Sequence, residues 1–215
     1  MIEILQVFSI AVLILSIVVH EFSHGWMANN LGDPTAKHMG RLTLNPIPHI
    51  DLMGSIIVPI LLLISNTGFI IGWAKPVPYN PYNLRDQKRG EMLVALAGPA
   101  SNLLLALIFG IMIRVLLIQG TAISSSIIIF FGIIVFYNIL LAVFNLVPIP
   151  PLDGSKILFH FLPYSMHGVR ETMERNSMLF LLLFIFFGFR LIIPVMLYLF
   201  VLVTGSVELL VVMFG

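Results

Sequence analysis

The sequence predicts an all-α polytopic membrane protein with about four to six membrane helices, a re-entrant segment and a short β-hairpin. Of its 215 residues, 59% are apolar and 10% are charged, whereas about a quarter of the residues of a soluble domain are charged. The mean hydropathy is +1.06. We therefore expect a single membrane-embedded domain over residues 1–215. The balance of 11 basic and 10 acidic residues provides no basic surface for nucleic acid.

Three apolar runs are long enough to cross a bilayer, which takes roughly 20 helical residues. They are Ile4–Trp26, Met92–Ile118 and Ile127–Val147. The C-terminal run, 178–215, is long enough for one tilted crossing or two short ones, and Arg190 and Pro194 stand in its middle. A cation at mid-membrane costs at least about 2.5–3.5 kcal/mol, so Arg190 favours a helix break near the interface or a partnered position. The sequence does not choose between one crossing and two.

A shorter apolar run, Met53–Ile64, is predicted to be re-entrant or interfacial, because about 12 residues are too few for a crossing and Pro59 interrupts them. The segment Phe69–Val77 after it is rich in β-branched and aromatic residues and is followed by proline, which predicts an extended or hairpin structure. At membrane depth such backbone has to be covered by protein or line a wet cavity.

Basic residues flank this re-entrant segment on both sides. They are Lys37 and Arg41 before it, and Lys75, Arg85, Lys88 and Arg89 after it. Because loops rich in Lys and Arg face the cytoplasm, both flanks are predicted to be cytoplasmic. The predicted topology has the N-terminus outside and residues 25–91 and 151–177 in the cytoplasm.

Two histidines stand four residues apart near the inner end of the first crossing, in the sequence His-Glu-Phe-Ser-His from His20 to His24. At that spacing both imidazoles lie on one helix face and can chelate one Zn²⁺, with Glu21 beside the metal as a general base. The alternative is a pair of core histidines with protein partners. Polar and ionisable groups inside an apolar run are costly, which favours the functional interpretation.

A catalytic zinc usually has three protein ligands, and Asp153 is the leading candidate for the third. The chain has no cysteine, so a metal has to be held by His, Asp or Glu. Asp153 follows the third crossing, where prolines at 148, 150 and 151 must end the helix. The alternative is an ordinary interfacial turn, for which Pro, Asp and Gly are common. In the predicted topology both motifs fall near the cytoplasmic face.

Three motifs together resemble the site-2 proteases, intramembrane zinc metalloproteases that cleave transmembrane segments of their substrates. The motifs are His20-Glu-Phe-Ser-His24, Ala97-Gly-Pro-Ala-Ser-Asn102 and Asn145-Leu-Val-Pro-Ile-Pro-Pro-Leu-Asp153-Gly154. They occur in the family's order over residues 20–154. The resemblance implies a compact bacterial-type member in the cell membrane, without the PDZ or nucleotide-sensing domain of larger members. Serine at position 155, where many members have glycine, fits that compact branch.

The resemblance also implies roles for single residues. His20, His24 and Asp153 would bind one zinc ion, Glu21 would be the catalytic base, and Asn145 would lie near the reaction centre. Ile70, Ile71 and Gly72 lie in the part that is similar to a re-entrant β-hairpin thought to present the substrate strand. For Asn102 we weigh a substrate contact against an interhelical hydrogen bond, since either would explain an amide in an apolar helix.

Three local expectations complete the prediction. Gly98-Pro99 is expected at a helix start, since proline is tolerated in a first turn. Asp51 is expected to cap the short helix after it. His49 is expected to be exposed in a loop.

Two rival functions are a membrane metal-ion transporter and a catalytically inactive scaffold. A transporter predicts ligands from several helices near the midplane, often in duplicated halves, whereas this chain has one His-x-x-x-His pair and no internal repeat. A scaffold does not require the two histidines, the glutamate and the aspartate. The sequence does not identify the substrate, the cleavage site, the trigger or the oligomeric state.

Overall fold

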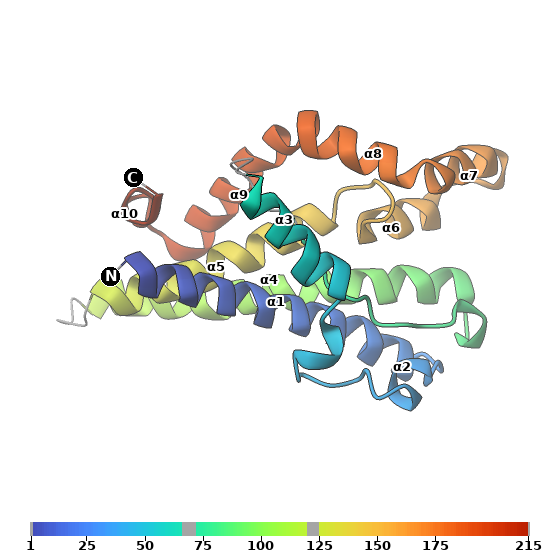
Figure 1. The fold of residues 1–215 in the computed structure, drawn as a ribbon, viewed down its shortest axis with the longest axis horizontal. Helices are drawn as coiled ribbons and strands as arrows, with labels where there is room; N and C mark the ends of the chain where they lie inside the picture. Colours follow the sequence, from blue (N-terminus) through green and yellow to red (C-terminus); the bar gives the residue numbers. More distant parts are fainter. Residues whose placement is uncertain (1, 66–71, 120–124, 215) are drawn as a thin grey trace.

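Three long helices lie side by side and form the centre of the molecule (Figure 1). The computed structural model describes residues 2–65, 72–119 and 125–214. The three helices are α1 (Ile2–Asn30), α4 (Gln87–Gln119) and α5 (Ser125–Asn145). Each packs against the other two, and they correspond to the three predicted crossings. Consecutive helices of the three run in opposite directions, so the end of α1, the start of α4 and the end of α5 lie toward the same end of the bundle (Figure 1).

The C-terminal apolar run forms one long helical stretch. It consists of α8 (Ser177–Leu183), a π-helical segment (Phe184–Gly188) and α9 (Phe189–Thr204). Gly205 ends α9 with a φ of 75°, a left-handed conformation that glycine adopts readily. The short helix α10 (Glu208–Phe214) follows. Of the two alternatives left open by the sequence, the structure therefore has a single helix long enough to cross.

Four helical stretches among the described residues are long and apolar enough to cross a membrane. They are Glu3–Asn30, Gln87–Ile118, Ser126–Asn145 and Ser177–Thr204. Residues 2–65, 72–119 and 125–214 contain no strand. The predicted all-α polytopic membrane protein is thereby confirmed.

The connection between α1 and α4 consists of short helices and extended chain. Its helical pieces are α2 (Thr35–His38), a 3₁₀ turn (Ile47–His49), a π-helical segment (Leu52–Ile57), α3 (Val58–Ile64) and a 3₁₀ turn (Pro81–Asn83). Asp51 caps the π-helical segment through Oδ1, which accepts a hydrogen bond from the Gly54 N–H at 2.7 Å, as predicted. The helical residues 52–64 rise by about 20 Å at most, too little to cross a bilayer.

The predicted β-hairpin stays a prediction. Ile70 and Ile71 lie outside the described residues, and residues 72–80 have no regular secondary structure. Gly72 is exposed and lies close to the π-helical segment, where an added Cβ would be 2.9 Å from the Gly54 carbonyl oxygen.

After α5, the chain turns back toward the bundle. Residues 146–152 are irregular, and α6 (Asp153–Phe161) packs against α4. A 3₁₀ turn (Tyr164–Met166) and α7 (His167–Arg175) follow and lead into α8. This return brings Asp153, the first residue of α6, next to the C-terminal half of α1.

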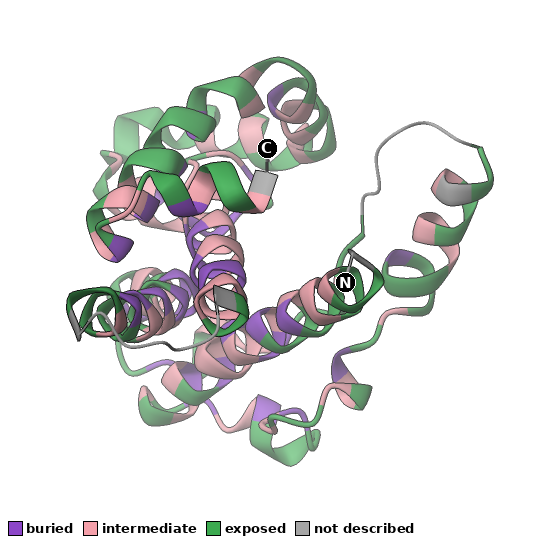
Figure 2. Ribbon diagram, turned by 90° about the vertical axis from the view of Figure 1, so that its left-hand side faces the viewer, coloured by how far each residue is buried: buried purple, intermediate pink, exposed green. Residues whose placement is uncertain are grey.

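Burial separates the bundle interior from its outer faces (Figure 2). Buried apolar side chains of α4, α5 and α9 form the main core, including Ala106, Ile113, Val135, Ile139 and Phe200. Large apolar side chains cover much of the outside, as expected for a surface that faces lipid. The interior also contains polar side chains, among them Ser16, His20, Asn102 and Asn138.

Two local expectations were wrong. Pro99 lies inside α4 and not at its start, because the helix extends beyond the apolar run to Gln87 and is preceded by Asp86, whose Oδ1 accepts from the Arg89 N–H at 3.0 Å. His49 is only 2% exposed, because its loop folds back onto residues 73–76 and its carbonyl accepts from the Lys75 N–H at 2.9 Å.

Candidate metal centre

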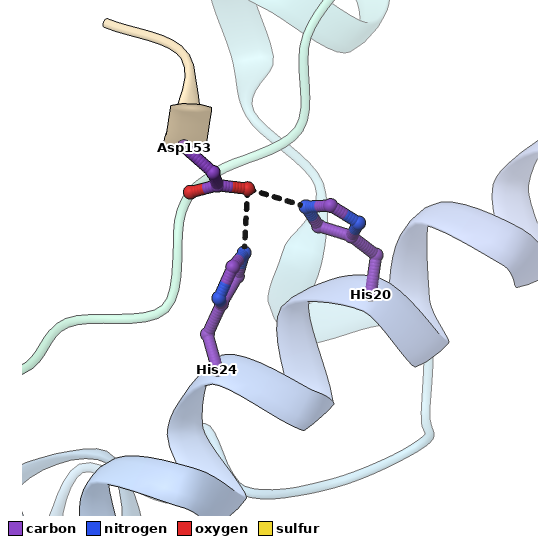
Figure 3. A group of neighbouring side chains, drawn as sticks. All are labelled: His20, His24 and Asp153. Atoms are coloured by element: carbon purple, nitrogen blue, oxygen red, sulfur yellow. Dashed lines mark hydrogen bonds and ion pairs between the residues drawn. The ribbon is translucent and has the colours of Figure 1, made fainter. Parts of the chain in front are cut away.

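Two imidazole rings project from successive turns of α1 toward Asp153 (Figure 3). His20 and His24 are four residues apart, so the helical repeat places them on one face. Their ring centroids are 4.6 Å apart. The side chain of His20 is 6% exposed and that of His24 is 12% exposed. The histidine pair predicted from the sequence is therefore close together and directed into the protein.

Asp153 is the first residue of α6, and its carboxylate faces both histidines (Figure 3). The proline-containing segment 146–152 ends α5 and lets the chain fold back. Gly154 permits this close return, because a Cβ there would lie 2.2 Å from the Leu146 carbonyl oxygen. Asp153 is 9% exposed, so the turn carries a carboxylate into a largely buried position.

The three side chains converge on one carboxylate oxygen. Oδ2 of Asp153 is 3.1 Å from Nε2 of His20 and 3.2 Å from Nε2 of His24. The three candidate ligand atoms lie within 4.8 Å of one another, the one such group found among the described residues. Tetrahedral zinc with ligand distances of about 2.0–2.2 Å places neighbouring ligand atoms roughly 3.3–3.5 Å apart. The observed separations are close to that spacing.

The hydrogen bonds on the far side of each ring determine where the ring proton lies. Nδ1 of His24 is 2.7 Å from the Val94 carbonyl oxygen, which can only accept, so Nδ1 carries the proton. Nδ1 of His20 is 2.6 Å from Oδ1 of Asn102, whose NH₂ group faces the Ser16 carbonyl at 3.2 Å. A neutral imidazole protonated on Nδ1 has its lone pair on Nε2. Both lone pairs therefore point toward the carboxylate.

Three hydrogen-bond acceptors thus meet at one place, which is unfavourable unless a cation or protons lie among them. Protons would require two adjacent imidazolium ions beside a single carboxylate. One divalent cation satisfies all three acceptors at once. Metal-binding histidines commonly donate their other ring N–H to a carbonyl or carboxylate, as both rings do here. Two nitrogens, one oxygen and a remaining position for water form the ligand set of a catalytic zinc site.

Burial raises the pKa of the Asp153 carboxyl, and the two imidazoles lower this pKa well below its ordinary value only when they are protonated and donate to the carboxylate. With both lone pairs directed at the carboxylate, a bound cation takes over that role. A carboxyl group must be deprotonated to bind a metal as a ligand.

Glu21 is held beside this centre by the extended segment 72–80. Its Oε2 accepts a hydrogen bond of 2.7 Å from the Val77 backbone N–H, and its charge interacts with His24. The segment packs closely on α1, since a Cβ added to Gly25 would lie 2.8 Å from Cγ1 of Val77. The predicted base is therefore next to the candidate ligands, and its carboxylate is oriented by main chain.

The same segment is anchored at a second point by Asp33, in the loop after α1. The Asp33 side chain is fully buried and accepts from the N–H of Asn80 at 2.6 Å and from Nδ2 of Asn83 at 2.8 Å. It also accepts from the hydroxyl of Thr35 at 2.5 Å. Burial raises the pKa of Asp33, but these hydrogen bonds outweigh it and the net pKa is lowered.

Asp33→Asn is expected to destabilise the protein by about 2 kcal/mol at neutral pH, because hydrogen bonds to a charged group contribute roughly 1.5–3 kcal/mol each. The pKa is lower in the folded state, so this contribution is complete above the unfolded pKa of about 3.9 and is lost as pH falls through the folded pKa. Thermal unfolding of wild type and variant near pH 7 and near pH 2 measures it. The difference between them should shrink in acid, and an equal difference at both pH values would exclude this role.

Gly98 of α4 lies directly against the candidate ligands. An added Cβ would be 2.5 Å from Nε2 of His24 and 2.6 Å from Nε2 of His20, distances that real Cβ atoms do not show. Gly98→Ala is therefore expected to displace both rings and to reduce zinc content severely in a protein that still folds. Metal analysis of the purified variant checks this. Gly168→Ala is a matched control, since an added Cβ there meets nothing within 4 Å.

The remaining predicted site residues are placed differently. Asn145 donates from Nδ2 to the Leu141 carbonyl of its own helix at 2.9 Å, and among the described residues it forms no hydrogen bond with the three candidate ligands. Asn102 forms interhelical hydrogen bonds, the second of the two alternatives weighed for it, and it is fully buried behind His20.

Sequence reasoning missed three groups that lie against the histidines or against Asn102 behind them. The carbonyl of Val94 left no signal, because any residue has a carbonyl. The sequence predicts only a helix start at Gly98, because the contact of Gly98 with the histidines depends on how α4 lies on α1. Asn138 did leave a signal, an amide inside the apolar run of the third crossing.

Comparison with known proteins identifies a family and several relatives. The model for peptidase family M50 matches residues 111–188, a range that contains Asp153 but not the two histidines. "Putative zinc metalloprotease YwhC" of Bacillus subtilis (strain 168) is 39% identical over 189 residues, which cover 84% of this chain and 81% of the relative.

More distant relatives are matched over about half of their length. "Putative zinc metalloprotease Rip2" of Mycolicibacterium smegmatis is 34% identical over 145 residues, covering 66% of this chain and 52% of the relative. "Putative zinc metalloprotease MJ0611" of Methanocaldococcus jannaschii is 37% identical over 106 residues, covering 49% of this chain and 50% of the relative. No solved structure matches the chain significantly. From the family match and the extent of the similarity to these relatives, the chain belongs to peptidase family M50, the site-2 protease family of membrane zinc metalloproteases.

Proposed function

We propose that this membrane zinc metalloprotease hydrolyses peptide bonds in or near the transmembrane segments of other membrane proteins, through a single domain over residues 1–215. The observation that carries the proposal is the convergence of Nε2 of His20, Nε2 of His24 and Oδ2 of Asp153 within an apolar helical bundle. A zinc site enclosed by membrane helices is accessible to substrates that themselves lie in the membrane.

We propose that the active centre faces the cytoplasmic side of the cell membrane. The end of α1, the start of α4 and helices α6 and α7 lie at the same end of the molecule (Figure 1). This end carries a large share of the basic residues, among them Lys37, Arg41, Lys88, Arg89, Arg170 and Arg175. That distribution supports the orientation, since basic loops stay in the cytoplasm.

In the proposed mechanism, His20, His24 and Asp153 would hold zinc, which would act as a Lewis acid on the scissile carbonyl and lower the pKa of the attacking water. Glu21 takes the proton from that water and delivers it to the leaving amine. The Val77 N–H holds the Glu21 carboxylate in the orientation for both transfers. We propose that Asn145 lies near the scissile carbonyl of the substrate, because it stands eight residues before Asp153.

We further propose that the chain around Ile70, Ile71 and Gly72 receives the substrate as an added strand. Peptide carbonyls in a helix are already hydrogen-bonded, so a transmembrane substrate has to be unwound before attack. The described residues 72–80 run extended beside Glu21, which supports a role for this segment in aligning an extended substrate.

Purified protein in liposomes with a model single-span substrate tests the function and separates it from its rivals. Zinc content and cleavage are measured before and after treatment with a chelator, and again after zinc is restored. We expect about one zinc per chain, loss of cleavage with the metal, and recovery on its return. Metal flux without cleavage would indicate the transporter, and absence of stoichiometric zinc would indicate the scaffold.

A further inference from the structure

A buried polar network stands behind His20, among α1, α4 and α5. Asn102 of α4 and Asn138 of α5 are both fully buried, and Ser16 of α1 is 4% exposed. Nδ2 of Asn102 donates to Oδ1 of Asn138 at 2.8 Å, and Oδ1 of Asn102 faces Nδ1 of His20 at 2.6 Å. Each buried amide would cost free energy if its partners were absent, so a network of this kind needs every member satisfied.

The direction of every hydrogen bond in this network is determined by main-chain carbonyls. Asn138 lies 2.9 Å from the Ile134 carbonyl, which can only accept, so the group directed there is its NH₂ and its oxygen faces Asn102. Asn102 lies 3.2 Å from the Ser16 carbonyl as well as 2.8 Å from that oxygen, so its NH₂ faces both. Its own oxygen is left for His20. The NH₂ of Asn138 also reaches Oγ of Ser16 at 3.0 Å.

We propose that Asn138, acting through Asn102, is a positioning residue that sets the tautomer of His20. With Asn138 in place, Asn102 can only present an acceptor to His20, which keeps the proton on Nδ1 and the Nε2 lone pair directed at the metal centre. Without it, the Asn102 amide loses one of the two acceptors that orient it, and the ring proton is free to move to Nε2. The inference rests on the proposed role of His20 as a zinc ligand.

The physical consequence concerns zinc affinity. Outer partners of metal-binding histidines typically change metal affinity by about 10–100-fold. Only the oxygen of each amide matters for the direction of the hydrogen bond that reaches His20. A protonated aspartate at either position keeps an acceptor oxygen and an O–H that can donate to the main-chain carbonyl, whereas a leucine of similar size keeps neither. The proposal therefore predicts that aspartate and leucine variants differ, although both remove the same NH₂ groups.

The experiment compares Asn138→Leu, Asn138→Asp, Asn102→Leu and Asn102→Asp in the full-length membrane protein. Zinc affinity is measured by competition with a chelator, and the visible spectrum of the Co²⁺-substituted protein reports the ligand geometry. We expect Asn102→Leu to weaken zinc binding by about 10–100-fold and Asn138→Leu by about tenfold, each with an altered Co²⁺ spectrum. Both aspartate variants should keep a wild-type spectrum and bind zinc more tightly than the corresponding leucine variant.

Thr204→Val is the matched control for loss of a buried polar group, because Thr204 is fully buried in α9 and donates to the Phe200 carbonyl away from the centre. It should change unfolding temperature but not zinc affinity. If Asn138→Leu folds and binds zinc as wild type does, or if both substitutions at a position weaken zinc equally, the network only packs helices and the proposal is wrong.

Two further results keep the test decisive. Should Asn138→Leu fail to fold, Asn138→Asp carries the test alone, and weakened zinc binding in that variant overturns the proposal. His20→Ala separates this inference from the proposed function. If His20→Ala retains full zinc affinity, the ligand assignment itself fails; if it loses zinc while the asparagine variants do not, only the positioning role fails.

Discussion

Glu21→Gln is expected to retain zinc and to lose peptide hydrolysis by about 10²–10⁴-fold, the usual contribution of a general base. Glutamine keeps the size of the side chain and an oxygen that can accept from the Val77 N–H, which is 2.7 Å from Oε2 in the wild type. It cannot take a proton from water. The loss should therefore appear in kcat, with zinc content and unfolding temperature close to those of wild type.

Glu3→Gln is the control for removing a carboxylate from the same helix, since Glu3 is exposed in the first turn of α1. It should cleave the model substrate at the wild-type rate. Cleavage by Glu21→Gln at a comparable rate would remove Glu21 from the mechanism. Loss of zinc along with activity would instead make it a structural support of the metal centre.

Asp153→Asn is expected to lose zinc and, with it, all measurable cleavage. Two imidazole nitrogens remain, but the one anionic ligand is gone. The loss of affinity should exceed the roughly 100-fold upper range for outer partners of a metal site. Zinc content after purification and chelator competition measure it. Asp86→Asn is the control, since Asp86 caps α4 outside the centre, and it should keep its zinc.

The same variant tests why the centre needs a cation. In wild-type protein stripped of metal, two Nε2 lone pairs face one carboxylate oxygen at 3.1 and 3.2 Å. An amide at position 153 can donate an N–H to one of these nitrogens, which relieves the repulsion. Metal-free Asp153→Asn should therefore unfold at a temperature at least as high as metal-free wild type. A clearly lower unfolding temperature would mean that protons already satisfy the three acceptors.

The transmembrane helices could be predicted from the sequence because lipid imposes one simple condition. Backbone groups in a bilayer must bond within their own segment, so a long apolar run has to be helical. The runs Ile4–Trp26, Met92–Ile118 and Ile127–Val147 therefore reappear as α1, α4 and α5. The bounds were less predictable, since α4 begins at Gln87 and takes in Pro99. The first turn of a membrane helix does not have to be apolar, so the apolar run does not mark where the helix begins.

The C-terminal run shows the limit of that condition. The apolar pattern around Arg190 and Pro194 was compatible with one membrane crossing and also with two. The structure keeps the chain helical from Ser177 to Thr204, with π-helical turns just before Arg190 and contacts between α9, α4 and α5. Local hydropathy is the same for one long helix and for two short ones, so the apolar pattern did not determine the number of helices.

By itself, the sequence determined the helical membrane class and the identity of the candidate ligands, because a repeat of 3.6 residues puts His20 and His24 on one face and prolines must release Asp153 from a helix. Only the tertiary structure decided that these groups meet, since Asp153 approaches α1 through the return of α6. It alone also brought the Val94 carbonyl, Asn102 and, through Asn102, Asn138 behind the rings. The direction of a hydrogen bond depends on which groups face each other across helices, and no spacing within one segment contains that information.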